Sequence, residues 1–500
     1  MEEQIKELKD ILGEVRDLDY ASAILEWDEQ VNMPAEGSHE RGEQLATLKR
    51  IAHLKFTSNG VGEILETLSP SLGSLDPDSD DARLVRQAQR EFRIRTKVPA
   101  DYVSREARVT SAAHQTWVKA RAASDFSIFH PTLREIVELK REYSSFFAPF
   151  EHPYDPLLDQ FEPGMKTLEV GQIFNRIRPQ QTALIQAIAG RPETDDSFLH
   201  QPYSKGKQWE FGVEVITRYG YEWKRGRQDY APHPFCTSFG LGDVRITTRI
   251  YPDQFGPGLF STLHECGHAL YEQGVSQSLA RTPLANGASL GIHESQSRMW
   301  ENLVGRSRPF WDYYYPRLQE VFPSQLGNVP LDLFFKAVNK VKPSLIRVDA
   351  DEATYNLHVM LRLELEVAMI EGSIAIGELP EAFDQKMEEY LGIRPPDEAS
   401  GVLQDVHWSM GILGYFPTYA IGNLISGQLW ERIQEDIPDL EDQIRRGDFA
   451  ALLAWNREKI HRHGAKFEPQ ELVERVTGSR IDPDPYLRYL KEKFGEIYHL

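Results

Sequence analysis

The chain has 500 residues, of which 41% are hydrophobic and 26% are charged. These fractions are ordinary for a folded globular protein, and the length is sufficient to bury a large core. The formal net charge of −20 argues against a nucleic-acid-binding protein and against binding to acidic membranes, because both partners attract basic surfaces.

The cysteine content and the first residues indicate the compartment. There are two cysteines, Cys236 and Cys266, which is too few for a disulfide framework and favours a reducing environment. The N-terminus is acidic and lacks the apolar segment of a secretory signal, and no apolar run approaches the length of a membrane span. We therefore expect a cytoplasmic protein.

The N-terminal half of the chain shows helical periodicity. Apolar residues recur every three or four positions over residues 3–26, as in an amphipathic helix. Further helices are expected, in chain order, over residues 38–53, 60–68, 81–95, 99–123 and 131–147, two within 165–192, and one over 207–220. The stretch between residues 69 and 81 is rich in Ser, Pro and Asp and is predicted to be a loop.

From Pro232 the pattern changes. Residues 243–251 are rich in β-branched side chains with rough alternation, which predicts a strand in a small antiparallel sheet around 236–251. Helical patterns then return over 289–306, 331–342, 346–372, 380–391, 403–410, 418–435 and 449–462. We expect a single mainly α domain over residues 1–500, cleft by an active site, in which a helical part of about residues 1–230 covers the groove and a part of about 231–500 is catalytic.

The most informative stretch is His264-Glu265-Cys266-Gly267-His268. In a helix, His264 and His268 stand one turn apart on the same face, where two neutral imidazoles can bind one zinc ion. Glu265 is placed to reach a water on the open side of the metal, and the pattern is typical of metalloproteases. The alternative is a helix with two unrelated surface histidines. Cys266 points elsewhere around the helix and is interpreted as a small packing residue.

A catalytic zinc site needs a third protein ligand and one open position. Glu294, 26 residues after His268 on a second helical pattern, is the candidate. Two imidazole nitrogens and one carboxylate oxygen suit zinc or cobalt better than calcium or magnesium. His293 is interpreted equally as a group that supports the ligands or contacts substrate and as a capping or packing residue. Glu265 would accept the proton of the attacking water and return it to the leaving amine.

Several stretches, in this order, resemble the M32 metallocarboxypeptidases, the carboxypeptidase Taq family. They are His233-Pro234-Phe235, Asp243-x-Arg245-x-Thr247, His264-Glu265-Cys266-Gly267-His268, His293-Glu294-Ser295-Gln296 and Ile346-Arg347-x-Asp349-Ala350. The N-terminal stretch from Trp27 to Pro34 is similar as well. The resemblance implies a large helical fold with a deep groove, similar to the neurolysin group. It also implies zinc, with cobalt as a substitute, a homodimer, and broad removal of single amino acids from peptide C-termini.

An exopeptidase of this kind must bind a free carboxylate, and an arginine provides a two-pronged donor for it. Arg347 is the first choice, because it matches the arginine of the family motif; the alternative is an ordinary ion pair with Asp349. Arg245 is as well explained by pairing with Asp243 as by a substrate contact. His233, before a rigid proline, is a further candidate for lining the site.

The stretch from His407 to Tyr419 is similar to the part of neurolysin-like enzymes that stabilises the oxyanion. Tyr415 or Tyr419 would donate a phenolic hydrogen bond, and His407 would assist. Aromatic residues at such spacing are more often core residues, so this alternative stays open.

Two other functions remain open at this point. One is a zinc oligopeptidase that cuts internally or releases dipeptides, which would use the same metal residues. The other is a non-catalytic metal-binding helical protein.

Overall fold

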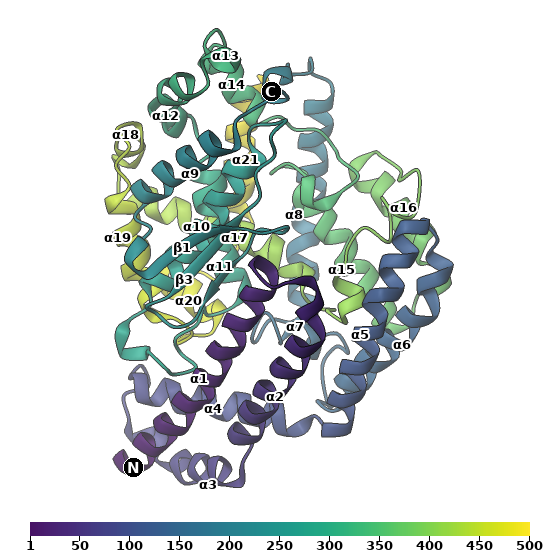
Figure 1. The fold of residues 1–500 in the computed structure, drawn as a ribbon, viewed down its shortest axis with the longest axis vertical. Coiled ribbons are helices and arrows are strands. Elements are labelled where there is room, and N and C mark those ends of the chain that lie inside the picture. Colours follow the sequence, from purple (N-terminus) through teal and green to yellow (C-terminus); the bar gives the residue numbers. More distant parts are fainter.

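Helices form most of the protein, as the apolar periodicity predicted. The computed structural model describes residues 1–500, except for the side chain of Ala35. The N-terminal helices are α1 (Glu2–Val31), α2 (Ser38–Phe56), α3 (Asn59–Leu68), α4 (Asp80–Lys97), α5 (Ala100–Ala123), α6 (Phe126–Ser145), α7 (Asp155–Leu158), α8 (Thr167–Ala189) and α9 (Lys205–Tyr219). The helices α1 and α2 pack side by side, while α5 and α6 form part of the lobe at the right of Figure 1.

The second half of the chain supplies most of the centre of the molecule and of the end opposite the N-terminus (Figure 1). Its helices are α10 (Pro257–Gly274), α11 (Leu290–Arg298), α12 (Arg308–Val321), α13 (Pro323–Leu326), α14 (Leu331–Val338), α15 (Tyr355–Glu371), α16 (Leu379–Leu391), α17 (Phe416–Asp436), α18 (Leu440–Arg445), α19 (Ala450–Lys459), α20 (Pro469–Thr477) and α21 (Asp484–Tyr498). A π-helical turn, Met299–Val304, continues α11. Among the described residues, no helix combines the length and the apolar character that crossing a membrane requires.

The described strands form one sheet in the order β1-β3-β2. Its strands are β1 (Gly226–Tyr230), β2 (Cys236–Ser238) and β3 (Val244–Thr248). The sheet is mixed rather than antiparallel throughout, because β2 and β3 form a hairpin whereas β1 runs parallel to β3 along its other edge. Helix α10 packs against β3, and the Thr262 hydroxyl lies 2.9 Å from that of Thr248.

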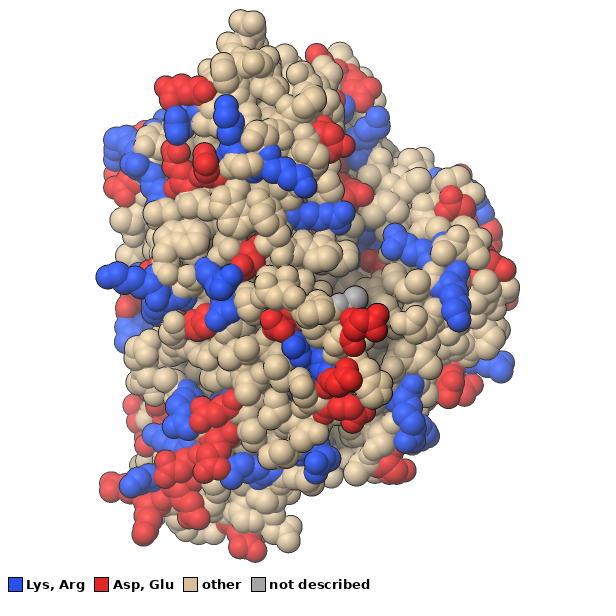
Figure 2. Space-filling model, viewed as in Figure 1, with Lys and Arg blue, Asp and Glu red and all other residues tan. Residues whose placement is uncertain are grey.

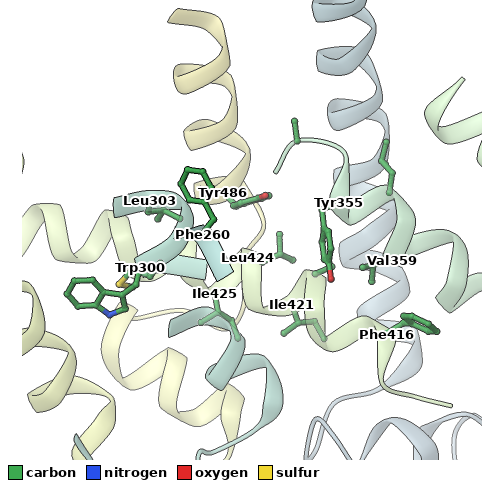
Figure 3. Close-up of a cluster of buried hydrophobic side chains, with 14 of the residues drawn as sticks. Phe260, Trp300, Leu303, Tyr355, Val359, Phe416, Ile421, Leu424, Ile425 and Tyr486 are labelled. Atoms are coloured by element: carbon green, nitrogen blue, oxygen red, sulfur yellow. The ribbon is translucent and has the colours of Figure 1, made fainter. Parts of the chain in front are cut away.

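The largest hydrophobic cluster is built around α17. Figure 3 shows Ile421, Leu424 and Ile425 of α17 between Trp300 of the π-helical turn and Tyr355 of α15. A second cluster joins α1, α3 and α4 to residues 275–285. Burial of these apolar faces is what holds amphipathic helices together, at about 25 cal/mol for each Å² removed from water.

Several expected elements differ from the structure. Residues 403–410 form only a 3₁₀ turn, His407–Met410, the helix expected from Pro131 begins at Phe126, and part of the loop expected between residues 69 and 81 is a 3₁₀ helix, Ser69–Ser74. Residues 167–189 form one helix, α8, rather than two, with Pro179 in its interior. The helix expected over 346–372 begins only at Tyr355, because the Asp351 carboxylate accepts hydrogen bonds from the backbone amides of Ala353 and Thr354 and so fixes a turn there. Arg347 consequently lies in a short 3₁₀ turn before α15. The division of the chain near residue 230 stays a prediction.

Candidate metal centre

The centre lies where α10 and α11 pack against each other in opposite directions. The contacts show the direction, since His264 meets Glu301 beyond the end of α11 while His268 meets His293 near its beginning. Gly267 makes the approach possible. A Cβ atom there would lie 2.6 Å from the backbone oxygen of Gln296, which is closer than side chains tolerate.

Helix α17 packs closely against α11 at Glu294. A Cβ atom on Gly422 would lie 2.6 Å from the Cβ of Glu294, so α17 also approaches α11 closely at the metal ligand. Two glycines on two neighbouring helices thus fix the position of α11, and with it the Glu294 carboxylate.

His264, His268 and Glu294 converge as expected. Their ligand atoms all lie within 4.8 Å of one another, and the Nε2 atoms of both histidines lie 3.5 Å from Oε2 of Glu294. The buried Cys266 does not join this group, in agreement with its interpretation as a packing residue.

The proton of His264 is held on Nδ1. This atom lies 2.9 Å from Oε2 of Glu301. Burial alone would raise the pKa of Glu301, but Arg298 and His264 hold it at about 2. An ionised carboxylate can only accept a hydrogen bond, so Nδ1 of His264 donates, and Nε2 is the ring nitrogen that would bind a metal.

His268 is oriented by a relay of two further side chains. Nδ1 of His268 lies 2.6 Å from Nδ1 of His293, whose Nε2 lies 2.7 Å from a carboxylate oxygen of Glu272. Because the carboxylate accepts from Nε2 of His293, Nδ1 of that ring accepts from His268. His268 therefore also presents a free Nε2, and burial lowers its pKa to about 4, which keeps the ring neutral.

Glu294 is held ionised. Its Oε1 accepts a 2.7 Å hydrogen bond from Nε of Arg298, and Ser297 donates to Oε2 at 3.1 Å. Burial opposes ionisation, yet Arg298 and the two histidines bring the pKa of Glu294 well below its usual range. Two imidazoles and one carboxylate, all with their outer atoms already hydrogen-bonded, fit a divalent cation.

Glu265 is buried as well, but its pKa is shifted in the opposite direction to that of Glu294. Burial raises its pKa to about 7, with the negative charges of Glu294 and Glu301 adding to the effect and His264 opposing it. A carboxyl group whose pKa is near neutrality can both accept and return a proton under ordinary conditions.

Arg347 is buried and belongs to a cluster of charged groups. Its Nη2 lies 2.9 Å from Oδ1 of Asp405, and its Nη1 donates to the hydroxyl of Tyr355 at 2.8 Å. Arg362 holds the other oxygen of Asp405 at 2.6 Å. The carboxylate that pairs with Arg347 is therefore Asp405 rather than the neighbouring Asp349.

Tyr355 connects this cluster to the metal centre. The guanidinium of Arg298 lies 4.5 Å from the centre of the Tyr355 ring, while the hydroxyl of the same ring accepts from Arg347. Arg347 thus lies at the Arg298 end of α11, on one side of the three converging ligands.

Tyr415, Tyr419 and His407 come together beside these groups. The two phenol rings are 5.2 Å apart, and Nε2 of His407 lies 3.3 Å from the Tyr419 hydroxyl. Burial and the charge of Glu294 raise the pKa of Tyr415 to about 12, so the phenol keeps its proton. His407 is neutral, since burial and Arg347 lower its pKa to about 4.

Arg245 and His233 make no hydrogen bond or ion pair with the described residues of this constellation. Arg245 forms a two-pronged pair with Asp243, at 2.8 and 2.7 Å, and its guanidinium lies 4.4 Å from the ring centre of Trp27. It thereby joins β3 to α1. His233 is exposed in the segment between β1 and β2.

A cavity of about 980 Å³ opens beside the side chains that hold His268. It is lined by Glu272 and His293 and by Phe161, which packs against Tyr415. On the face shown in Figure 2, the surface is hollowed between the lobe at the right and the rest of the molecule.

The sequence did not indicate several side chains that hold these groups: Glu301, Arg298, Glu272, Tyr355, Asp405 and Arg362. Glu301 and Arg298 lie one or two turns beyond Glu294, so helical spacing could have indicated them. Asp405 stands two residues before His407, but its pairing with Arg347 bridges 58 residues of chain. No local sequence pattern indicates such a contact.

Comparison with known proteins confirms the resemblance of the motifs. Residues 7–494 match the family described as carboxypeptidase Taq (M32) metallopeptidase. The sequence is 43% identical to thermostable carboxypeptidase 1 of Thermus thermophilus, over 95% of each chain, and 37% identical to carboxypeptidase 1 of Bacillus subtilis, over 99% of each.

Solved structures agree with the fold. The crystal structure of an M32 carboxypeptidase from Deinococcus radiodurans superimposes with a TM-score of 0.97 at 41% identity, covering 99% of this chain and 100% of that one. The carboxypeptidase of Pyrococcus furiosus gives a TM-score of 0.95 at 36% identity, covering 98% of this chain and 99% of the other.

Proposed function

Because this chain belongs to the carboxypeptidase Taq (M32) metallopeptidase family and is a metal-dependent carboxypeptidase, we propose that it releases amino acids singly from the C-termini of peptides, with broad specificity. We further propose that the metal is zinc, held by His264, His268 and Glu294, and that cobalt substitutes for it. Membership of this family argues against the alternative of a non-catalytic metal-binding protein.

The observation that carries the proposal is the excess positive charge around Arg347. Arg347 and Arg362 are both buried, and they share a single carboxylate, that of Asp405. Two cations and one anion leave one positive charge uncompensated within this group. A buried charge of this kind is costly unless it is paired, so the carboxylate of a peptide C-terminus is a well-matched partner for Arg347.

The other side chains would divide the chemistry among them. A bound divalent cation would supply Lewis acidity and a lowered pKa of water. Glu265 would accept the proton of the attacking water and deliver it to the leaving amine, as its near-neutral pKa allows. Tyr415 or Tyr419 would donate a hydrogen bond to the developing oxyanion, and His407, 3.3 Å from the Tyr419 hydroxyl, would orient that phenol.

Arg245 and His233 remain as secondary proposals. The pairing of Arg245 with Asp243 and its position over Trp27 support a role in holding the sheet to α1. Contact of Arg245 or His233 with substrate stays a prediction, as do the cytoplasmic location and the homodimer.

Product analysis tests the proposal directly. A peptide of eight to ten residues, of a length about 30 Å when extended, should give a ladder of products shortened one residue at a time from the C-terminus. The ladder should disappear with a chelator. The same peptide with an amidated C-terminus should be cleaved poorly, because it lacks the charge that Arg347 binds. Internal fragments or released dipeptides would favour the oligopeptidase alternative, and equal cleavage of both peptides would contradict the role of Arg347.

A further inference from the structure

Helix α4 carries a stripe of positive charge along one face. Its cations recur at alternating spacings of three and four residues, which places them one above another on a helix. They are Arg83, Arg86, Arg90, Arg93 and Lys97. The apolar residues Leu84, Val85 and Ala88 of the same helix are buried in the second hydrophobic cluster, so the stripe is directed away from that core.

A cavity of about 540 Å³ lies along this stripe, and all five cations line it. Lys466 adds a sixth cation, against three acidic lining residues, Asp159, Glu468 and Glu471, so the lining carries an excess charge of +3. The chain as a whole carries −20. A basic cavity on such an acidic protein concentrates negatively charged ligands.

Part of this charge is free to bind a ligand. Arg83 pairs with Asp78 and Glu471, and Arg90 pairs with Asp159. Among the described residues, no carboxylate lies within 4.0 Å of the basic groups of Arg86, Arg93 or Lys97. The side chains of Arg86 and Arg93 are exposed.

The basic cavity is continuous with the larger cavity, which reaches the centre only through His293, the hydrogen-bond partner of His268. Both are lined by Arg90, Arg93 and Ala288, and the larger one continues to His293 and Glu272. Arg347 lies at the Arg298 side of the candidate ligands, whereas the larger cavity begins at the His268 side, beside His293. A peptide held at Arg347 by its C-terminus and cleaved at these ligands extends away from Arg347. Its N-terminal part is therefore directed toward the stripe on α4.

From this arrangement we propose that the α4 stripe is an upstream subsite that selects peptides with acidic residues N-terminal to the cleaved bond. The inference rests on the proposed function, because the direction of the peptide follows from Arg347. The ligand is the set of Asp and Glu side chains of the substrate, and Arg86, Arg93 and Lys97 are the cations that bind it.

The test compares peptides that share their last four residues and differ upstream, where one carries several Glu and the other Ser. At low salt, wild type should show a kcat/KM for the acidic peptide about tenfold above that for the neutral one, since each exposed charge pair contributes roughly two- to fivefold. The ratio should approach one at about 1 M salt, where the screening length is about 3 Å. The double substitution Arg86→Glu and Arg93→Glu should bring the ratio below one.

The double substitution Arg50→Glu and Arg446→Glu is the matched control, because both are exposed arginines that line neither cavity. It should leave the ratio unchanged, and an equal effect of this control would reduce the result to a general charge effect and overturn the subsite. A ratio near one in wild type would overturn it as well. A labelled, amidated acidic peptide, which should be cleaved only poorly, should bind wild type more tightly than the double variant. That binding measurement can fail independently of peptide hydrolysis, so the two proposals are tested separately.

Discussion

Each of the three candidate ligands makes a hydrogen bond to a further side chain. Glu301 supports His264, His293 supports His268, and Arg298 supports Glu294. Such hydrogen bonds fix the tautomer and orientation of a ligand before the metal arrives, so less ordering is required on binding. The two histidines thus present the same ring nitrogen, Nε2, although different partners hold them.

Replacement of Glu265 should separate metal binding from turnover. Glu265→Gln keeps the shape of the side chain but cannot accept a proton, so kcat should fall by about 10²- to 10⁴-fold. Bound metal, measured by elemental analysis, should stay at the wild-type level because Glu265 is not among the three converging ligands. Near-normal turnover in this variant would exclude Glu265 as the general base.

Replacement of the supporting residues should weaken metal binding. Glu301→Ala and His293→Ala each remove the acceptor that holds a ligand histidine, and loss of such a partner typically costs 10- to 100-fold in metal affinity. Competition with a chromophoric chelator measures the dissociation constant. A conservative change, Glu301→Gln, retains an acceptor oxygen and should recover part of the loss. Unchanged affinity in both alanine variants would show that these contacts do not position the ligands.

At the residue scale, the sequence was sufficient for groups that are close together along the chain. The spacing of His264 and His268 follows from one turn of helix, and Glu294 was found because it lies on the next helical segment. The ion pair of Arg347 with Asp405 was missed, and Asp349 was considered instead, because an ion pair across 58 residues depends on how helices pack and leaves no periodic signal.

At the level of elements, the position of Glu294 depends on two helix contacts made through glycine. Gly267 brings α10 against the backbone of α11, and Gly422 brings α17 against Glu294 itself. Any larger residue at either position must separate the helices. The metal ligands therefore depend on residues that themselves carry no functional group.

Gly267→Ala should damage both stability and metal binding. The added methyl group would lie 2.6 Å from backbone atoms of Gln296 and Ser297, which cannot rotate away, and overpacking of this kind costs about 1–3 kcal/mol. Metal affinity should fall because α11 is displaced from α10. Thermal unfolding and chelator competition measure the two effects.

Gly171→Ala provides the control for this experiment. Gly171 lies in α8, where an added Cβ meets no described atom within 4 Å. Alanine is favoured over glycine in a helix by about 0.5–1 kcal/mol, so this variant should be as stable as wild type or slightly more so. Equal destabilisation by the two substitutions would contradict the close-contact argument.

The elements themselves were largely predictable from periodicity, except where polar contacts override it. The helix expected from residue 346 starts at Tyr355 because the Asp351 side chain caps the chain there. The direction of β1 was missed because strand pairing depends on topology, and β1 itself lay outside the residues expected to form the sheet. The first error arises because polar hydrogen bonds override the apolar periodicity, and the second because the pairing of strands does not follow from their own sequences.

On the scale of the whole molecule, a metal bound at the candidate centre would join segments that are otherwise held by packing. The ligands come from α10 and α11, which belong to the largest hydrophobic cluster. A ligand that binds only the folded state stabilises it, by about 4 kcal/mol when its concentration is about 1,000 times the dissociation constant. Metal removal should therefore be visible in global unfolding.

Chelation should accordingly lower the melting temperature of the wild type, measured by calorimetry or circular dichroism. Glu294→Ala removes one ligand and should abolish the difference between metal-loaded and chelated protein. A chelator effect that persists in this variant would place the stabilising ion elsewhere in the molecule.

The charged cluster at Arg347 should make global stability sensitive to acid. Burial opposes ionisation of Asp405, but Arg362 and Arg347 hold its pKa well below the usual range. Since the pKa is lower in the folded than in the unfolded state, the stabilisation by Asp405 is present above about pH 4 and is lost as the pH falls below that value.

Asp405→Asn leaves two buried guanidinium groups without a counterion, and breaking a buried pair in this way costs about 3–5 kcal/mol. Urea unfolding at pH 7 should show this full loss, and at pH 3 the difference between wild type and variant should be smaller. A difference that stays constant between pH 7 and pH 3 would mean that Asp405 is not the ionised bridge between Arg347 and Arg362, and the excess positive charge assigned to the substrate carboxylate would then need another origin.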